Sequence, residues 1–202
     1  MTTGTTTRRV AFVTFGKGSG DLVIGISLAA AFRRAGLDVV FTAITNNEFP
    51  EIARGHIDVI TVPPEPHLFL VADKQTKLWR ALKSQRFDLL IVFGSWLPMY
   101  PLLPELRCSK VLLTRQVNEP FLHARIGPDD EIEVNPEDYD LALNCEPSFA
   151  LPGFEHINPI VIRNRDEILP RDEARRKLGV PDGKRLAVIA RNGYEGELEE
   201  LI

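Results

Sequence analysis

Short apolar runs rich in β-branched residues recur along this chain, and each is followed by a glycine or a polar turn. Runs that are apolar at nearly every position predict strands buried on both faces, as in a parallel sheet covered by helices. The pattern therefore predicts an α/β protein. The predicted strands are 9–15, 38–44, 57–62, 88–93, 110–114, 140–145 and 186–190.

The clearest helix follows the first of these runs. Leu22, Ile26 and Phe32 give it an apolar face, and Gly36 is a typical stop signal. Asp21 stands where a helix N-cap is expected. Strand, glycine loop, helix and strand together predict a right-handed βαβ unit.

Two further helices are predicted later in the chain. One spans 71–84, with Leu78 and Leu82 facing the sheet. The other lies in the stretch RDEARRKLG, which has acidic residues in its first turn, basic residues in its last turn and Gly179 as its stop.

Composition excludes several classes of function. The 202 residues carry a net charge of −4 without a cluster of Lys and Arg, which argues against nucleic-acid binding. No apolar run approaches the roughly 18 residues of a transmembrane helix. Cys108 and Cys145 lack the CxxC spacing of a zinc site, and the four histidines share no ligand spacing, so we expect no metal and a reduced, cytoplasmic setting.

The organisation of the chain changes near residue 160. Prolines and charges accumulate there, and a fresh apolar run and a glycine turn follow. We expect a first domain over 1–160, a linker with a short helix over 161–185, and the beginning of a second domain over 186–202. An apolar strand without its neighbours favours self-association, which we expect through 186–202.

The loop FGKGSGD, residues 15–21, raises the question of function. A dinucleotide fingerprint starting at Gly16 needs glycine at position 21, and the P-loop pattern is missing. Asp21 would also repel a phosphate from the helix N-terminus. Two interpretations remain: Asp21 is only a helix cap, or the loop presents its carboxylate as a base at the carboxyl end of the first strand.

The stretch 18–43, GSGDLVIGISLAAAFRRAGLDVVFTA, resembles the start of the acceptor-binding domain of GT-B glycosyltransferases. In the antibiotic and sterol members that loop ends in an aspartate that serves as general base, and in the peptidoglycan N-acetylglucosaminyltransferases a histidine stands there. The resemblance implies a Rossmann-like fold, a catalytic role for Asp21 and acceptor binding by Gly18, Ser19 and Gly20. Lys17 and Gly18 replace the glycine and serine that open the motif, and Ile24 replaces a frequent proline.

The resemblance extends to 174–201, which is similar to the entry of the donor-nucleotide domain in the same enzymes. It implies that Asn192 and Gly193 approach the diphosphate of a nucleotide sugar, such as a UDP- or TDP-sugar. It implies neither a metal nor a cofactor. The signature that recognises the nucleoside lies beyond Ile202 in such proteins, so we expect this chain alone to be inactive.

Other polar or aromatic residues follow the later strands. Ser95 and Trp96 are candidates to line an acceptor cleft, although Trp96 packing under a helix over 99–106 is an equal alternative. Arg115, Gln116 and Glu119 are polar groups at the same edge.

We thus expect an inverting glycosyltransferase, or its acceptor-binding part, which moves a sugar to a hydroxyl acceptor. Two alternatives stay open. One is a non-catalytic module of a split glycosyltransferase that binds an acceptor or a partner. The other is a nucleotide-sugar 2-epimerase of the same fold, whose first loop, G-T-R-P-E, is missing here.

Overall fold

The structure is a computed structural model, and it describes residues 7–16, 19–63, 75–115, 122–125, 131–145 and 151–187. The chain divides into two compact units, Met1–Ile162 and Arg163–Ile202. The larger unit holds the sheet and the helices that cover it.

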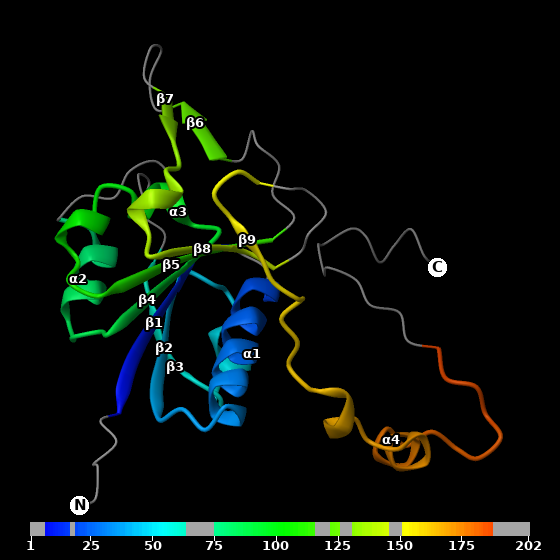
Figure 1. Ribbon diagram of the computed structural model, residues 1–202. Helices are drawn as coiled ribbons and strands as arrows, with labels where there is room; N and C mark the ends of the chain where they lie inside the picture. Colours follow the sequence, from blue (N-terminus) through cyan, green and yellow to red (C-terminus); the bar gives the residue numbers. More distant parts are fainter. Residues whose placement is uncertain are drawn as a thin grey trace, which may run out of the picture. The chain divides into compact units, whose positions relative to one another are not determined.

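Seven parallel strands form the sheet of the larger unit, in the order β3-β2-β1-β4-β5-β8-β9 (Figure 1). This mostly apolar parallel sheet with flanking helices is a Rossmann-like α/β fold, as the sequence predicts. The first six predicted strands are all present, and the last three residues of the seventh lie outside the described residues. The strands are β1 (Arg8–Thr14), β2 (Val39–Thr45), β3 (Asp58–Thr61), β4 (Leu89–Phe93), β5 (Ser109–Thr114), β8 (Leu141–Asn144) and β9 (Glu155–His156).

Helix α1 (Gly20–Arg34) covers one face of the sheet (Figure 1). At Gly25 a side-chain Cβ would come within 2.9 Å of the Phe12 ring of β1, so the helix backbone packs directly on this ring. Gly36 follows the helix with φ 71°, as its stop signal predicts. The expected N-cap is wrong by two residues: Ser19 takes that position, and Asp21 lies inside the first turn.

Helices α2 (Lys77–Lys83) and α3 (Trp96–Met99) cover the opposite face (Figure 1). Leu78 and Leu82 of α2 are buried, as predicted. Thr76 caps α2 by accepting a hydrogen bond from the Trp79 backbone N–H at 3.2 Å, so the helix begins later than expected; residues 71–74 lie outside the described residues. The two faces of the sheet carry separate apolar clusters, one under α1 and one under α2 and α3.

Some elements have no counterpart in the predictions. Strands β6 (His123–Arg125) and β7 (Glu131–Glu133) pair antiparallel in a separate two-stranded sheet. The expected helix over 99–106 is instead α3, which starts at Trp96, followed by a 3₁₀ helix, Leu103–Glu105. Further 3₁₀ helices in the described part of the chain include Pro50–Ala53, Pro136–Asp138 and Arg165–Glu167.

The smaller unit contains α4 (Arg171–Lys177), the short helix that the sequence predicts. Gly179 ends it with φ 66°, and Arg175 Nη2 donates to the carbonyl oxygens of Pro181 and Lys184. These bonds close the turn that follows the helix.

Candidate functional site

The strand order places a topological switch point between β1 and β4. From β1 the chain builds outward through β2 and β3, and it then returns to β4 on the other side of β1. In open α/β sheets ligands bind beyond the carboxyl ends of the strands at such a point. The candidate residues Asp21 and Ser95 follow the two strands that flank it.

The first loop is tied down on both sides of β1. Ser95, after β4, accepts a hydrogen bond from the Phe15 backbone N–H at 2.8 Å. Asn46, after β2, accepts one from the Gly16 N–H at 3.0 Å, and Asn47 Nδ2 donates to the Gly16 carbonyl oxygen at 3.3 Å. Residues that follow the two strands beside β1 therefore hold the start of the loop that leads into α1.

The Asp21 carboxylate lies in the first turn of α1 and pairs with an arginine from a distant strand. Arg115 directly follows β5, and its Nη2 lies 3.4 Å from Asp21 Oδ1. The Asp21 side chain is 30% exposed and that of Arg115 40% exposed. Both groups can thus meet a ligand while remaining in contact with each other.

Two influences act on the Asp21 carboxyl in opposite directions. Burial raises its pKa above the ordinary aspartate value because the charged form loses hydration. The nearby Arg115 guanidinium lowers the pKa, but its effect is smaller. The result is a carboxylate that accepts a proton more readily than an exposed aspartate does.

Thr14, the last residue of β1, adds a buried polar group at the same edge. Thr14 is 1% exposed, and no described residue forms a hydrogen bond with its Oγ1. Because strand side chains alternate, Thr14 lies on the same face of β1 as Phe12, which packs against Gly25 of α1. The hydroxyl is therefore on the face that carries Asp21.

The structure brings some of the predicted site residues together and places others in the core. Gly20, Asp21 and Arg115 come together, because a Cβ at Gly20 would lie 3.7 Å from Arg115 Nη2. Ser19 is the N-cap residue of α1. Ser95 is buried and holds the loop. Trp96 is 3% exposed and belongs to the core under α2 and α3, which is the structural alternative rather than an exposed stacking surface. The remaining predicted residues lie outside the described residues: Gly18, Gln116, Glu119, Asn192 and Gly193.

Asn46 and Asn47 are loop-holding residues that sequence reasoning did not assign to the site. The sequence shows two consecutive asparagines directly after a buried strand, at the edge where open sheets bind ligands. That placement is the available signal. Their partner Gly16 lies 30 and 31 residues earlier, which no local pattern reveals.

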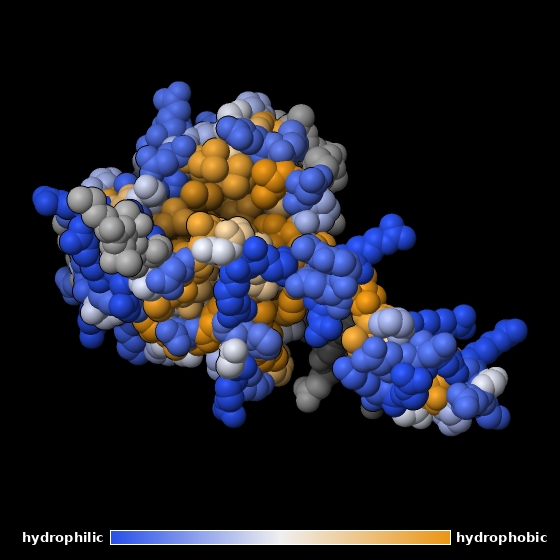
Figure 2. Space-filling view, turned by 60° about the horizontal axis from the view of Figure 1, so that its bottom comes forward, coloured by the Kyte–Doolittle hydropathy of each residue, from blue (hydrophilic) through white to orange (hydrophobic). Residues whose placement is uncertain are grey.

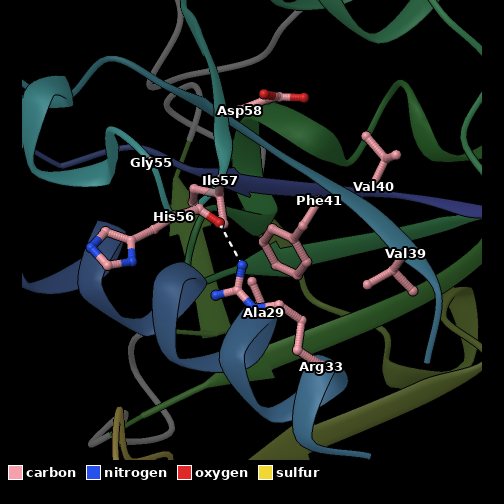
Figure 3. A pocket seen from close by; sticks show the side chains of 9 residues that line it. All are labelled: Ala29, Arg33, Val39, Val40, Phe41, Gly55, His56, Ile57 and Asp58. Carbon is pink, nitrogen blue, oxygen red and sulfur yellow. Dashed lines mark hydrogen bonds between the residues drawn. The ribbon is translucent and has the colours of Figure 1, made fainter. Parts of the chain in front are cut away.

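Two cavities lie at the other edge of the sheet, where the strands begin. One of about 390 Å³ lies beside the starts of β2 and β3, and Arg33 Nη1 donates across it to the His56 carbonyl oxygen at 3.0 Å (Figure 3). Another of about 710 Å³ is lined by apolar residues such as Val10, Phe32 and Leu37. Figure 2 turns the lower side of Figure 1 forward. In this view hydrophobic residues gather over part of the surface of the larger unit.

Within the described residues, no group of three or more His, Cys, Asp or Glu side chains is arranged to hold a metal ion. The same residues contain no helix with the length and apolar character needed to cross a bilayer.

The chain is similar to known proteins in its fold. No model of a protein family matches the chain, and no curated protein matches it. Among solved structures, the fold is similar to SsfS6, a glycosyltransferase from Streptomyces sp. SF2575, with a TM-score of 0.48 and 13% identity. The similarity covers 81% of this chain and 57% of that enzyme, so the chain spans less than two thirds of its length.

Proposed function

We propose that this chain is the acceptor-binding part of an inverting glycosyltransferase, with Asp21 as the general base. The observation that carries the proposal is the position of the Asp21 carboxylate. It is half-buried at the carboxyl end of β1, beside the switch point between β1 and β4, and Arg115 contacts only one of its oxygens. The resemblance of 18–43 to the acceptor loop of GT-B enzymes supports the same role.

The chemistry explains why a carboxylate belongs at this place. An acceptor hydroxyl is a poor nucleophile until a base removes its proton as the oxygen attacks the anomeric carbon of the donor. A carboxylate whose pKa is raised by burial holds that proton better than an exposed one, and proton transfer becomes easier as the pKa approaches the working pH. Asp21 therefore combines access with increased basicity.

The donor is a nucleotide sugar with uridine or thymidine diphosphate as leaving group. In this proposal its diphosphate binds to backbone N–H groups and a helix N-terminus in the second domain, where Asn192 and Gly193 would lie beside it. A site of that kind neutralises the leaving group without a bound cation. The acceptor hydroxyl approaches from the larger unit, beside Asp21.

The test uses the protein encoded by the complete gene. It is incubated with labelled UDP- and TDP-sugars and a panel of hydroxyl acceptors, and the products are identified by mass and by the anomeric configuration of the new bond. We expect transfer with inversion. Hydrolysis or 2-epimerisation of the donor in place of transfer, or acceptor binding without turnover, would contradict the proposal and favour the epimerase or the non-catalytic module.

A further inference from the structure

The two oxygens of the Asp21 carboxylate have different surroundings. Oδ1 lies 3.4 Å from Arg115 Nη2. Oδ2 faces Gly16, and a Cβ at residue 16 would come within 2.8 Å of it. Among the described residues, Arg115 is the only hydrogen-bond or ion-pair partner of the carboxylate, and no described donor contacts Oδ2.

The position of Arg115 is unusual for a cation. It lies beside the first turn of α1, where the helix dipole disfavours positive charge. Two neighbours accommodate the guanidinium: Gly20 has no side chain between the helix and Nη2, and the Phe93 ring centroid lies 6.0 Å from Arg115 Cζ. The Asp21 carboxylate is the group that compensates for the unfavourable dipole.

Gly16, which faces the carboxylate, and the described residues that hold Phe15 and Gly16 in place are uncharged. Gly16 comes from the β1–α1 loop, Asn46 and Asn47 follow β2, and Ser95 follows β4. Lys17 lies outside the described residues. Arg115, from the end of β5, is thus the charged group that acts on Asp21.

We propose that Arg115 is a positioning residue, which holds Oδ1 of Asp21 so that Oδ2 stays turned toward the space beside Gly16 and accepts the proton there. The proposal rests on the proposed function of Asp21 as base. It reassigns Arg115 from a contact of the acceptor to a partner of the base. It also gives Gly16 a role, because any side chain at that residue would occupy the place beside Oδ2.

Carbon-detected NMR of the aspartate carboxyl groups tests the inference without any assay of transfer. The Asp21 signal is assigned as the one that disappears in Asp21→Asn, and it is then titrated in the unmodified protein and in the variants Arg115→Gln, Arg115→Lys and Arg107→Gln. Arg107 is the matched control because it precedes the same strand β5 that Arg115 follows.

We expect the pKa of Asp21 to rise in Arg115→Gln, because the cation that favours the charged form is gone. It should stay close to the unmodified value in Arg115→Lys and in Arg107→Gln. An Asp21 pKa that does not change in a folded Arg115→Gln protein overturns the inference, whether or not the protein transfers sugar. A rise in that pKa together with absence of transfer contradicts the proposed function and leaves the pairing supported.

Kinetics of the complete protein distinguish positioning from acceptor binding. We expect Arg115→Gln to lower kcat by about 10²-fold, the cost of a misplaced catalytic group, with partial rescue in Arg115→Lys. A rise in KM with kcat unchanged would show that Arg115 binds the acceptor instead, and it would overturn the inference. Gly16→Ala is a second variant: it should lower kcat with little loss of stability, because the new methyl group meets only the end of the Asp21 side chain.

Discussion

The two edges of the sheet use aspartates in different ways. At the amino edge, Asp88 Oδ2 accepts a hydrogen bond from the Arg9 N–H at 2.9 Å, and Asp140 Oδ2 accepts one from the Lys110 N–H at 2.7 Å. Each of these carboxylates satisfies the backbone of the neighbouring strand where pairing begins. At the carboxyl edge Asp21 has a side-chain partner, Arg115, and one oxygen without a described donor.

The comparison shows how location decides what a carboxylate can do. An aspartate that binds a strand N–H completes the sheet, and the oxygen that accepts this bond has a structural role. An aspartate that follows a glycine loop at the switch point keeps a lone pair for a ligand. Matched substitutions at the two edges therefore test whether an aspartate acts in the sheet or at a ligand site.

The largest effect is expected for Asp21→Asn in the complete protein. The amide has the shape of the carboxylate but cannot accept the proton, so the transfer rate should fall by roughly 10²- to 10⁴-fold. Asp88→Asn, the same chemical change at the amino edge, should leave the rate unchanged. Steady-state kinetics of both variants provide the measurement, and equal rates for the two would reduce Asp21 to a structural residue.

A smaller effect, on stability alone, is expected for Asp88→Ala. The change removes the acceptor of the Arg9 N–H and an ion pair in which Asp88 Oδ1 lies 3.7 Å from Arg8 Nη1. We expect the free energy of unfolding to fall by about 1.5 kcal/mol, measured by urea denaturation. Transfer should persist at the unmodified rate. A loss of transfer with an unchanged free energy of unfolding would contradict the assignment of the active site to the carboxyl edge.

Substitution of two threonines at the carboxyl edge should change the free energy of unfolding in opposite directions. Thr14 Oγ1 is buried with no hydrogen bond to a described residue, whereas Thr114 Oγ1 donates to the Leu143 carbonyl oxygen at 3.2 Å. We expect Thr14→Val to raise the free energy of unfolding by about 1 kcal/mol and Thr114→Val to lower it by a similar amount. If Thr14→Val is the destabilising one, its hydroxyl has a partner in the folded protein.

The smallest effect is a pH dependence of stability that comes from Asp21. Burial raises its pKa in the folded protein, so between the ordinary value of about 3.9 and the raised value the folded state binds more protons than the unfolded state. The free energy of unfolding should therefore fall as pH rises through this window, and Asp21→Asn should lack this contribution. Urea denaturation of both proteins at several pH values measures the difference, and the opposite slope would mean that Arg115 outweighs burial.

Much of the fold was predictable because its signals are local. Six strands were expected from their apolar runs, and Gly36 and Gly179 from their positions after helical segments. The N-cap was misplaced by two residues because serine and aspartate in GSGD both have capping side chains. The β6–β7 hairpin was missed because its strands are three residues long and rich in charge.

For the candidate site, the amino-acid pattern predicts that Asp21 follows a glycine loop at the end of a buried strand. The surroundings of Asp21 depend on the order of the strands in the sheet. Arg115 is 94 residues away, Ser95 lies 80 residues from its partner Phe15, and Trp96 turned out to be buried. The physical reason is that periodicity and turn chemistry depend on neighbouring residues, whereas the strand order β2-β1-β4-β5 brings together loops that are distant in the chain.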